Sequence, residues 1–135
     1  MPDDSVAVIR RLRDSAPGYE KWVARQEGIY PEDEELEYIQ ASNLALYAVE
    51  MAKANLVEDL PSLFAAAEEL LAIDDDVISN LVVVGFLEAV QNYALNRDVS
   101  LDRLTEFLGD LSFKRWVELL DGWSRLSVEL RKGRL

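Results

Sequence analysis

Residues 74–96, DDDVISNLVVVGFLEAVQNYALN, are the stretch that decides the fold. Three aspartates open it, and acidic side chains are favourable at a helix N-terminus, where backbone N–H groups lack partners and the helix dipole is positive. Apolar residues then occupy nearly every face, which leaves little room for a solvated side. Gly85 costs about 1 kcal/mol of helix propensity relative to alanine, so we expect a neighbouring backbone to cross closely there. The stretch predicts a buried central helix over about residues 75–96.

The chain before this stretch predicts four helices, over about residues 4–14, 19–28, 31–56 and 60–73. The third has the clearest start, because Pro31 is followed by four consecutive acids that suit the first turn of a helix. Its apolar positions, which include Ile39 and Leu56, predict one packed face. Tyr19 and Trp22 in the second helix are interpreted as core or rim residues, with a ligand-stacking platform as the alternative.

The chain after the stretch predicts a short helix from Ser100, closed by Gly109, and a long last helix over residues 111–133. Apolar residues recur in the last helix at spacings of three and four, which predicts one inward stripe that clamps the bundle. The stripe consists of Phe113, Trp116, Val117, Leu120, Trp123, Leu126 and Leu130.

No segment shows the period-two alternation of a strand, so the sequence predicts an all-α protein. The expected architecture is a compact bundle or a short two-layer array of six to seven helices around the buried central helix, because the short connections favour antiparallel neighbours. A length of 135 residues suits one domain that buries one core, so residues 1–135 are expected to form a single helical domain.

The residue types that the chain lacks restrict its chemistry. It contains no cysteine and no histidine. The first absence removes disulfides and thiol nucleophiles and fits a reducing compartment, and the second removes imidazole bases and the usual zinc ligands. We therefore expect no enzyme activity, no cofactor and no metal.

The net charge of −12 is concentrated in one part of the chain. Residues 26–80 contain one basic and fourteen acidic residues, whereas the remaining two parts are close to neutral. Such a field repels nucleic acid and anionic membranes and attracts basic partners. The N-terminus has no apolar signal segment, and the longest apolar run is shorter than the roughly 20 residues that span a membrane. We expect a soluble, cytoplasmic protein with a basic protein partner.

Two carboxylate clusters invite a metal interpretation. Asp74–Asp76 resembles the start of a calcium-binding loop, but Ile78, Ser79 and Gly85 occupy positions that need an oxygen ligand, a glycine and a glutamate, so helix capping explains the acids better. Glu68, Glu69 and Glu88 are the residues from which an all-carboxylate Mg²⁺ site would have to be built. For Glu88 we favour a structural ion pair, for example with Arg103 or Arg115, or a position at the rim of the core, over catalysis.

Three motifs carry a resemblance to a known family. They are Leu60-Pro61-x-Leu63-Phe64, Glu68-Glu69-Leu70-Leu71 and Val84-Gly85-Phe86-Leu87-Glu88, within the block from Val57 to Asn92. The block resembles a helical domain of small bacterial proteins that are encoded beside polymorphic and contact-dependent toxins and act as immunity proteins. The resemblance implies a cytoplasmic antidote that binds one cognate toxin and blocks its active site or its assembly.

Our leading hypothesis is therefore an immunity protein that occludes a toxin domain through an acidic surface. The predicted partner-binding residues are Glu32, Asp33, Glu34, Glu35, Glu37, Glu58, Asp59, Asp74 and Asp75. Their charge is expected to speed the encounter, and apolar anchors to supply most of the affinity. The alternative is a non-enzymatic scaffold or regulatory adaptor that self-associates, for example as a homodimer, through its tryptophan-bearing C-terminal helix.

Overall fold

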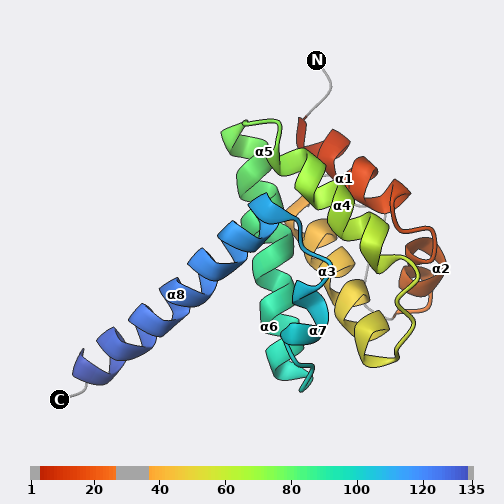
Figure 1. Cartoon of the computed structure of the whole chain (residues 1–135). Helices are drawn as coiled ribbons and strands as arrows, with labels where there is room; N and C mark the ends of the chain where they lie inside the picture. The colour runs from red at the N-terminus through yellow and green to blue at the C-terminus, as the bar shows by residue number, and fades with distance from the viewer. Residues whose placement is uncertain (1–3, 27–36, 134–135) are drawn as a thin grey trace.

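The computed structural model describes residues 4–26 and 37–133, with side chains described for residues 5–26 and 37–122 (Figure 1). These residues form helices and no strand, which confirms the all-α prediction. The elements are α1 (Asp4–Asp14), α2 (Tyr19–Ala24), α3 (Glu37–Lys53), α4 (Leu60–Leu71), α5 (Asp76–Asn80), η1 (Leu81–Leu87), α6 (Glu88–Asn96), α7 (Asp102–Thr105) and α8 (Asp110–Gly133). Because α5, η1 and α6 follow one another without a break, they form one helix, and the described chain has seven helices.

The helix formed by α5, η1 and α6 lies at the centre of the body, as predicted (Figure 1). Its middle, η1, is a π-helix, in which each N–H bonds five residues back. Gly85 lies against α3: a Cβ there would be 3.2 Å from the Ala41 Cβ and 3.3 Å from the Tyr38 Cδ1. Helix α3 therefore approaches Gly85 closely, as expected, although the nearest atoms belong to its side chains and not to its backbone.

The expectation that this helix has almost no solvated side is wrong at Val77, Val84 and Leu95, which are exposed. Val77, Asn80 and Val84 are three and four residues apart, so they share one helix face, and that face is left open by the neighbouring helices. By length and composition the helix is apolar enough to span a membrane, but half of its most apolar window is buried in the body. That burial is consistent with the core helix of a soluble protein.

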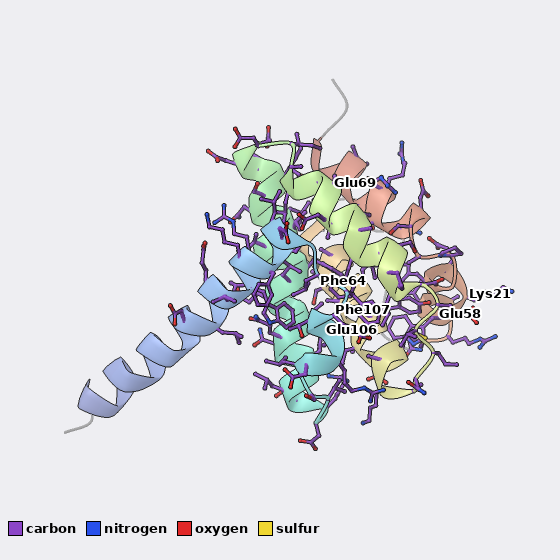
Figure 2. All side chains as sticks on the ribbon, in the orientation of Figure 1. Lys21, Glu58, Phe64, Glu69, Glu106 and Phe107 are labelled. Atoms are coloured by element: carbon purple, nitrogen blue, oxygen red, sulfur yellow. The ribbon has the colours of Figure 1, made fainter. Side chains whose placement is uncertain are left out.

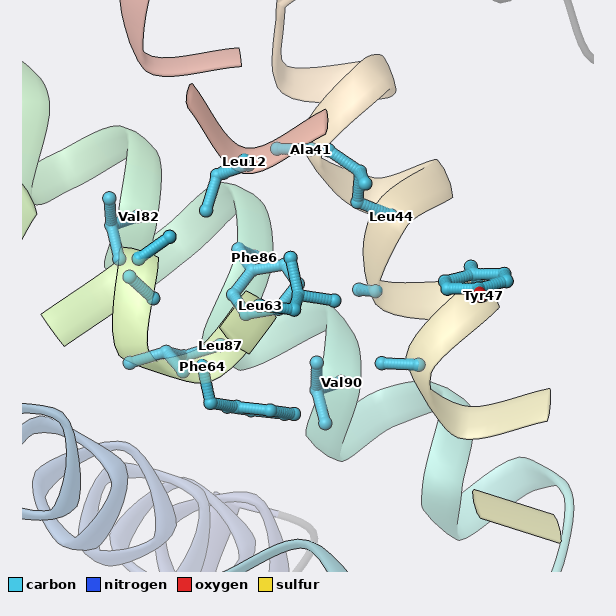
Figure 3. Packing of buried hydrophobic residues seen from close by; sticks show 14 of the residues in the cluster. Leu12, Ala41, Leu44, Tyr47, Leu63, Phe64, Val82, Phe86, Leu87 and Val90 are labelled. Carbon is cyan, nitrogen blue, oxygen red and sulfur yellow. The ribbon is translucent and has the colours of Figure 1, made fainter. Parts of the chain in front are cut away.

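The core joins α1, α3, α4 and the central helix (Figure 3). The Phe64 ring of α4 lies 5.5 Å from the Phe86 ring of η1 and stacks on Phe107 at 6.0 Å. Leu12 from α1 and Leu44 from α3 are fully buried in the same cluster. The central helix therefore packs on three sides against helices that come before and after it in the chain.

A smaller aromatic cluster fixes α2 against α3. Tyr19 is buried, Trp22 is partly buried, and both rings lie within 6 Å of the Tyr47 ring in edge-on geometry. Burial raises the pKa of Tyr19 to about 12. The core interpretation of Tyr19 and Trp22 is confirmed.

The single packed face predicted for α3 is confirmed in part. Tyr47, Val49 and Ala52 of that face are buried, but Ile39 and Leu56 are exposed, and Leu56 lies beyond the end of the helix at Lys53. The buried surface is wider than predicted and consists of Gln40, Ala41, Asn43, Leu44, Ala45, Tyr47, Ala48, Val49 and Ala52. Because α3 packs against α1 and α2 as well as the central helix, its small alanine side chains are covered on two sides.

Only part of the apolar stripe predicted for α8 packs against the body. Trp116 is buried, and its carbonyl accepts a hydrogen bond of 3.0 Å from the buried Gln91 side chain. Phe113 and Val117 were predicted to face inward but are exposed, because α4 and η1 cover only one side of α8. The rest of α8 extends away from the body (Figure 1).

Glu68 of α4 joins α8 to the body by capping it. Its carboxylate accepts hydrogen bonds from the backbone N–H groups of Leu111, at 2.9 Å, and Ser112, at 2.8 Å. Burial opposes ionisation of Glu68, but these hydrogen bonds outweigh it and lower the pKa of the carboxyl. Gly109 leaves room for this carboxylate, because a Cβ there would overlap the Glu68 side chain and displace it.

Candidate protein-binding surface

The nine acids predicted to bind a partner do not form one surface in the described part of the chain. Glu32, Asp33, Glu34 and Glu35 lie outside the described residues. The other five occupy three places: the start of α3, the turn before α4 and the turn after α4. Since α4 has 12 residues at about 1.5 Å per residue, the acids before and after it are separated by about 18 Å.

Before α4, Asp59 is used by the fold. Its Oδ2 accepts hydrogen bonds from the Gly18 N–H at 2.7 Å and from the Tyr47 hydroxyl at 2.6 Å. Burial, and then the hydrogen bond to Asp59, raise the pKa of Tyr47. Glu58 beside it is exposed (Figure 2). Only Glu58 of this pair points freely into solvent.

After α4, Asp74 and Asp75 lie together with a third acid, Asp76. Asp75 caps α5, because its Oδ1 accepts a 3.0 Å hydrogen bond from the Ile78 N–H. Asp74 has a left-handed backbone, with φ of 59°, and both Asp74 and Asp76 are exposed. The turn therefore presents two solvent-facing carboxylates on either side of a capping one.

Two large apolar side chains accompany these acids. Ile73 is 55% exposed and Val77 is 59% exposed, among the highest values for apolar residues in the described chain. We name residues 73–77 the α4–α5 corner. Val77 belongs to the stretch that the sequence predicts to be buried, but its place in the first turn of the helix, next to three acids, is a sequence signal of exposure.

An open pocket of about 530 Å³ lies directly beside the corner. It is bounded by the first turn of α3, by α5 and η1, and by α8. Its lining residues are Tyr38, Asp76, Val77, Ser79, Asn80, Val83 and Arg115. The Asn80 side-chain amide donates a 2.6 Å hydrogen bond to the Tyr38 hydroxyl, which ties α5 to α3 at the pocket edge. We name this cavity the Tyr38–Val77 pocket.

Glu37 lines a different cavity, of about 290 Å³, together with residues of α1 and α2. Arg13 and Glu20 in its wall form an ion pair at 2.7 Å. Although Glu37 and Tyr38 are adjacent in α3, they border separate cavities. The structure therefore places Glu37 apart from the α4–α5 corner.

The carboxylates considered for a metal site are separated in the structure. Glu68 caps α8, and Glu69 forms an ion pair of 2.6 Å with Arg11. Glu88 does not pair with the arginines suggested for it, since Arg103 bonds Asn55 and Arg115 bonds Glu118. Among the side chains described, those of residues 5–26 and 37–122, no three histidine, cysteine or acidic groups are placed so as to hold a metal ion.

A family model described as a domain of unknown function, DUF7674, matches residues 9–124, which is most of the chain. No curated protein and no solved structure matches it.

Proposed function

We propose that this chain, which belongs to the DUF7674 family, is an immunity protein that binds a cognate bacterial toxin domain and neutralises it by occlusion. In this proposal the protein performs no chemistry. It covers a basic surface of the toxin and so blocks the active site or the assembly of that toxin. The resemblance of residues 57–92 to such proteins supports the proposal, as does the concentration of negative charge in residues 26–80.

The observation that carries this proposal is the composition of the α4–α5 corner. Exposed carboxylates of Asp74 and Asp76 attract a basic partner from a distance and raise the association rate. Ile73 and Val77 supply apolar area, and full burial of such side chains is worth about 1.5–3 kcal/mol each. Since both are already partly covered, about half of that remains available to a partner. Specific interfaces usually have apolar anchor residues at their centre and charged or polar residues at their rim.

The corner is also held in place before any partner arrives. The Asp75 cap fixes the start of α5, and Leu71 and Ile78 on either side of the turn are buried in the core. A preformed surface loses little conformational entropy on binding, which favours tight association. This suits an inhibitor that has to remain bound to its target.

A growth assay tests the proposal. The proposal requires a toxin gene next to the gene for this chain, so the neighbouring genes are identified first, and the C-terminal domain of a large protein found there is expressed in bacteria with and without the chain. We expect that domain to stop growth and the wild-type chain to restore it. We expect Asp74→Lys/Asp76→Lys to restore growth poorly.

The matched control is Asp102→Lys/Glu106→Lys on α7. It makes the same change in charge and, like the test variant, reverses one acid in the first turn of a helix and one exposed acid nearby. Failure of the wild-type chain to protect would contradict the immunity proposal. Equal loss of protection in the two variants would remove the corner from it.

Self-association through α8 is the second candidate, because this helix extends away from the body and exposes Leu111, Phe113 and Val117 (Figure 1). Trp116 is in the core, so it serves the fold and is not available to a second copy. Light scattering of the full chain tests this candidate, with Phe113→Glu/Val117→Glu expected to convert a dimer to a monomer. Circular dichroism checks that the variant is folded, and a monomeric wild-type chain would exclude the candidate.

A further inference from the structure

The Tyr38–Val77 pocket has features that the charge of the corner does not explain. Its walls contain the exposed rings and methyl groups of Tyr38 and Val77, 46% and 59% exposed, and partly buried Val83 lies between them. Apolar groups thus gather at a hollow on the surface, where water has to be displaced before anything else can fill it. Burial of this apolar lining by a partner would be favourable.

The charges around the pocket favour a basic occupant. Asp76 lies in the rim, and Asp74 and Asp75 follow in the adjoining turn. Arg115 forms the opposite wall, but Glu118 lies 3.3 Å from it, one helical turn further along α8, and offsets its charge. The rim is therefore negative on the corner side and nearly neutral on the α8 side.

The shape of the pocket favours a protein segment over a small molecule. Small-molecule sites enclose most of their ligand, whereas here two of the walls are themselves about half exposed. Helices border the hollow on both sides, and amphipathic helices commonly lay an apolar face into such sites. The Tyr38 hydroxyl accepts a hydrogen bond from Asn80, so its own proton remains available to donate to an occupant.

We propose that the Tyr38–Val77 pocket receives an apolar side chain from an amphipathic helix of the partner, and that a lysine or arginine one turn away on that helix meets Asp76 and Asp74. This inference rests on the proposed function, since it names the part of the partner that the corner binds. In this inference most of the binding free energy comes from burial of the partner's side chain in the pocket, and the acids attract the partner before contact. Tyr38, Val77 and Val83 then contribute affinity, and Asp74 and Asp76 contribute association rate.

The test uses a 14-residue model peptide, acetylated Leu-Lys-Lys-Leu-Leu-Lys-Leu-Leu-Lys-Lys-Leu-Leu-Lys-Leu amide, as an amphipathic basic helix. Its binding to the full chain is followed by two-dimensional NMR of the backbone amides. We expect shift changes confined to Tyr38, residues 73–83 and the neighbourhood of Arg115. A second peptide with glutamate in place of lysine keeps the apolar pattern and is expected not to bind.

A matched pair of variants distinguishes specific binding of the peptide in the pocket from nonspecific hydrophobic binding elsewhere on the protein. Val77 and Leu95 are both 59% exposed and lie near opposite ends of the central helix. Val77→Ser is expected to weaken binding of the peptide about fivefold, the loss that a minor hot spot produces, and Leu95→Ser is expected to leave it unchanged. Equal effects of the two substitutions, binding of the glutamate peptide, or shift changes centred on α7 would overturn the inference.

Two further readouts keep the inference separate from the immunity proposal. If amides of the pocket shift with protein concentration in the absence of peptide, a second copy is the occupant and the inference is wrong. In the growth assay, full protection by Val77→Ser would remove the pocket from the interface while the immunity function stands. Loss of the immunity function would appear as failure of the wild-type chain itself, and the peptide titration would still decide what the pocket binds.

Discussion

The two ends of α4 carry similar acidic sequences and use them differently. At the N-terminal end, Asp59 accepts hydrogen bonds from Gly18 and Tyr47 and holds α2 and α3 against the body. At the C-terminal end, Asp74 and Asp76 point into solvent beside exposed Ile73 and Val77. The carboxylate at the N-terminal end is hydrogen-bonded within the molecule, and the two at the C-terminal end are exposed to solvent. The density of acids in a sequence therefore does not by itself separate structural carboxylates from functional ones.

The largest expected effect is at the structural end. Asp59→Ala leaves the Gly18 N–H and the Tyr47 hydroxyl without their acceptor, so we expect the free energy of unfolding to fall by about 2 kcal/mol. Urea denaturation of the wild type and the variant measures this difference in the free energy of unfolding. Glu58→Ala, one residue away and exposed, is the control and is expected to change it by less than about 0.5 kcal/mol. Equal losses in the two variants would break the comparison.

The cap on α8 extends the comparison to a third carboxylate of the acidic region. Glu68→Ala removes the acceptor for two backbone N–H groups, and Gly109→Ala pushes the carboxylate away from them. Each substitution is expected to cost about 1–2 kcal/mol. Because both act on one cap, the double variant should lose little more than either single variant. Additive losses in a double-mutant cycle would show that the two residues act separately.

The same cap predicts a dependence of stability on pH. The pKa of Glu68 is lower in the folded protein than its ordinary value of 4.5, so the folded state favours the ionised form. Its contribution to stability is complete above pH 4.5 and is lost as the pH falls through the lower, folded-state pKa. The difference in unfolding free energy between wild type and Glu68→Gln should therefore be constant near neutral pH and shrink in acid. A difference that persists unchanged at low pH would contradict the role of the charge.

The smallest effect on stability is expected at the corner. Asp74→Asn/Val77→Ser alters exposed side chains that no other described residue needs for a hydrogen bond. We expect the free energy of unfolding to change by less than about 0.5 kcal/mol, as measured by thermal and urea denaturation. A loss as large as that of Asp59→Ala would mean that the corner is structural too.

Much of the fold was predictable from the sequence because local patterns determine it. The central helix, its close crossing at Gly85 and the burial of Tyr19 and Trp116 all follow from helical periodicity, residue size and the cost of glycine. The full extent of the buried surface of α3 was not predictable in this way. Helix α3 is covered on two sides, and its alanines give no periodic signal because alanine occurs both buried and exposed. A stripe drawn through the larger residues therefore includes exposed Ile39 and omits buried alanines.

The candidate site was less predictable, because long-range contacts decide which acids are available. Asp59 is removed from the surface by Gly18, 41 residues earlier, and Glu68 by α8, more than 40 residues later. The Tyr38–Val77 pocket likewise combines α3, the central helix and α8. Local sequence contains none of these pairings. Charge density therefore selects a region of the chain but cannot identify which carboxylates in it face solvent.

The rate of association with the toxin domain tests the central claim most directly. Stopped-flow mixing of the full chain with an inactive form of the toxin domain identified by the growth assay gives that rate at several salt concentrations. We predict that Asp74→Lys/Asp76→Lys slows association about tenfold at low salt and flattens its salt dependence, while Asp102→Lys/Glu106→Lys retains a clearly faster rate. Association by the corner variant at the wild-type rate, with the same salt dependence, would contradict the account.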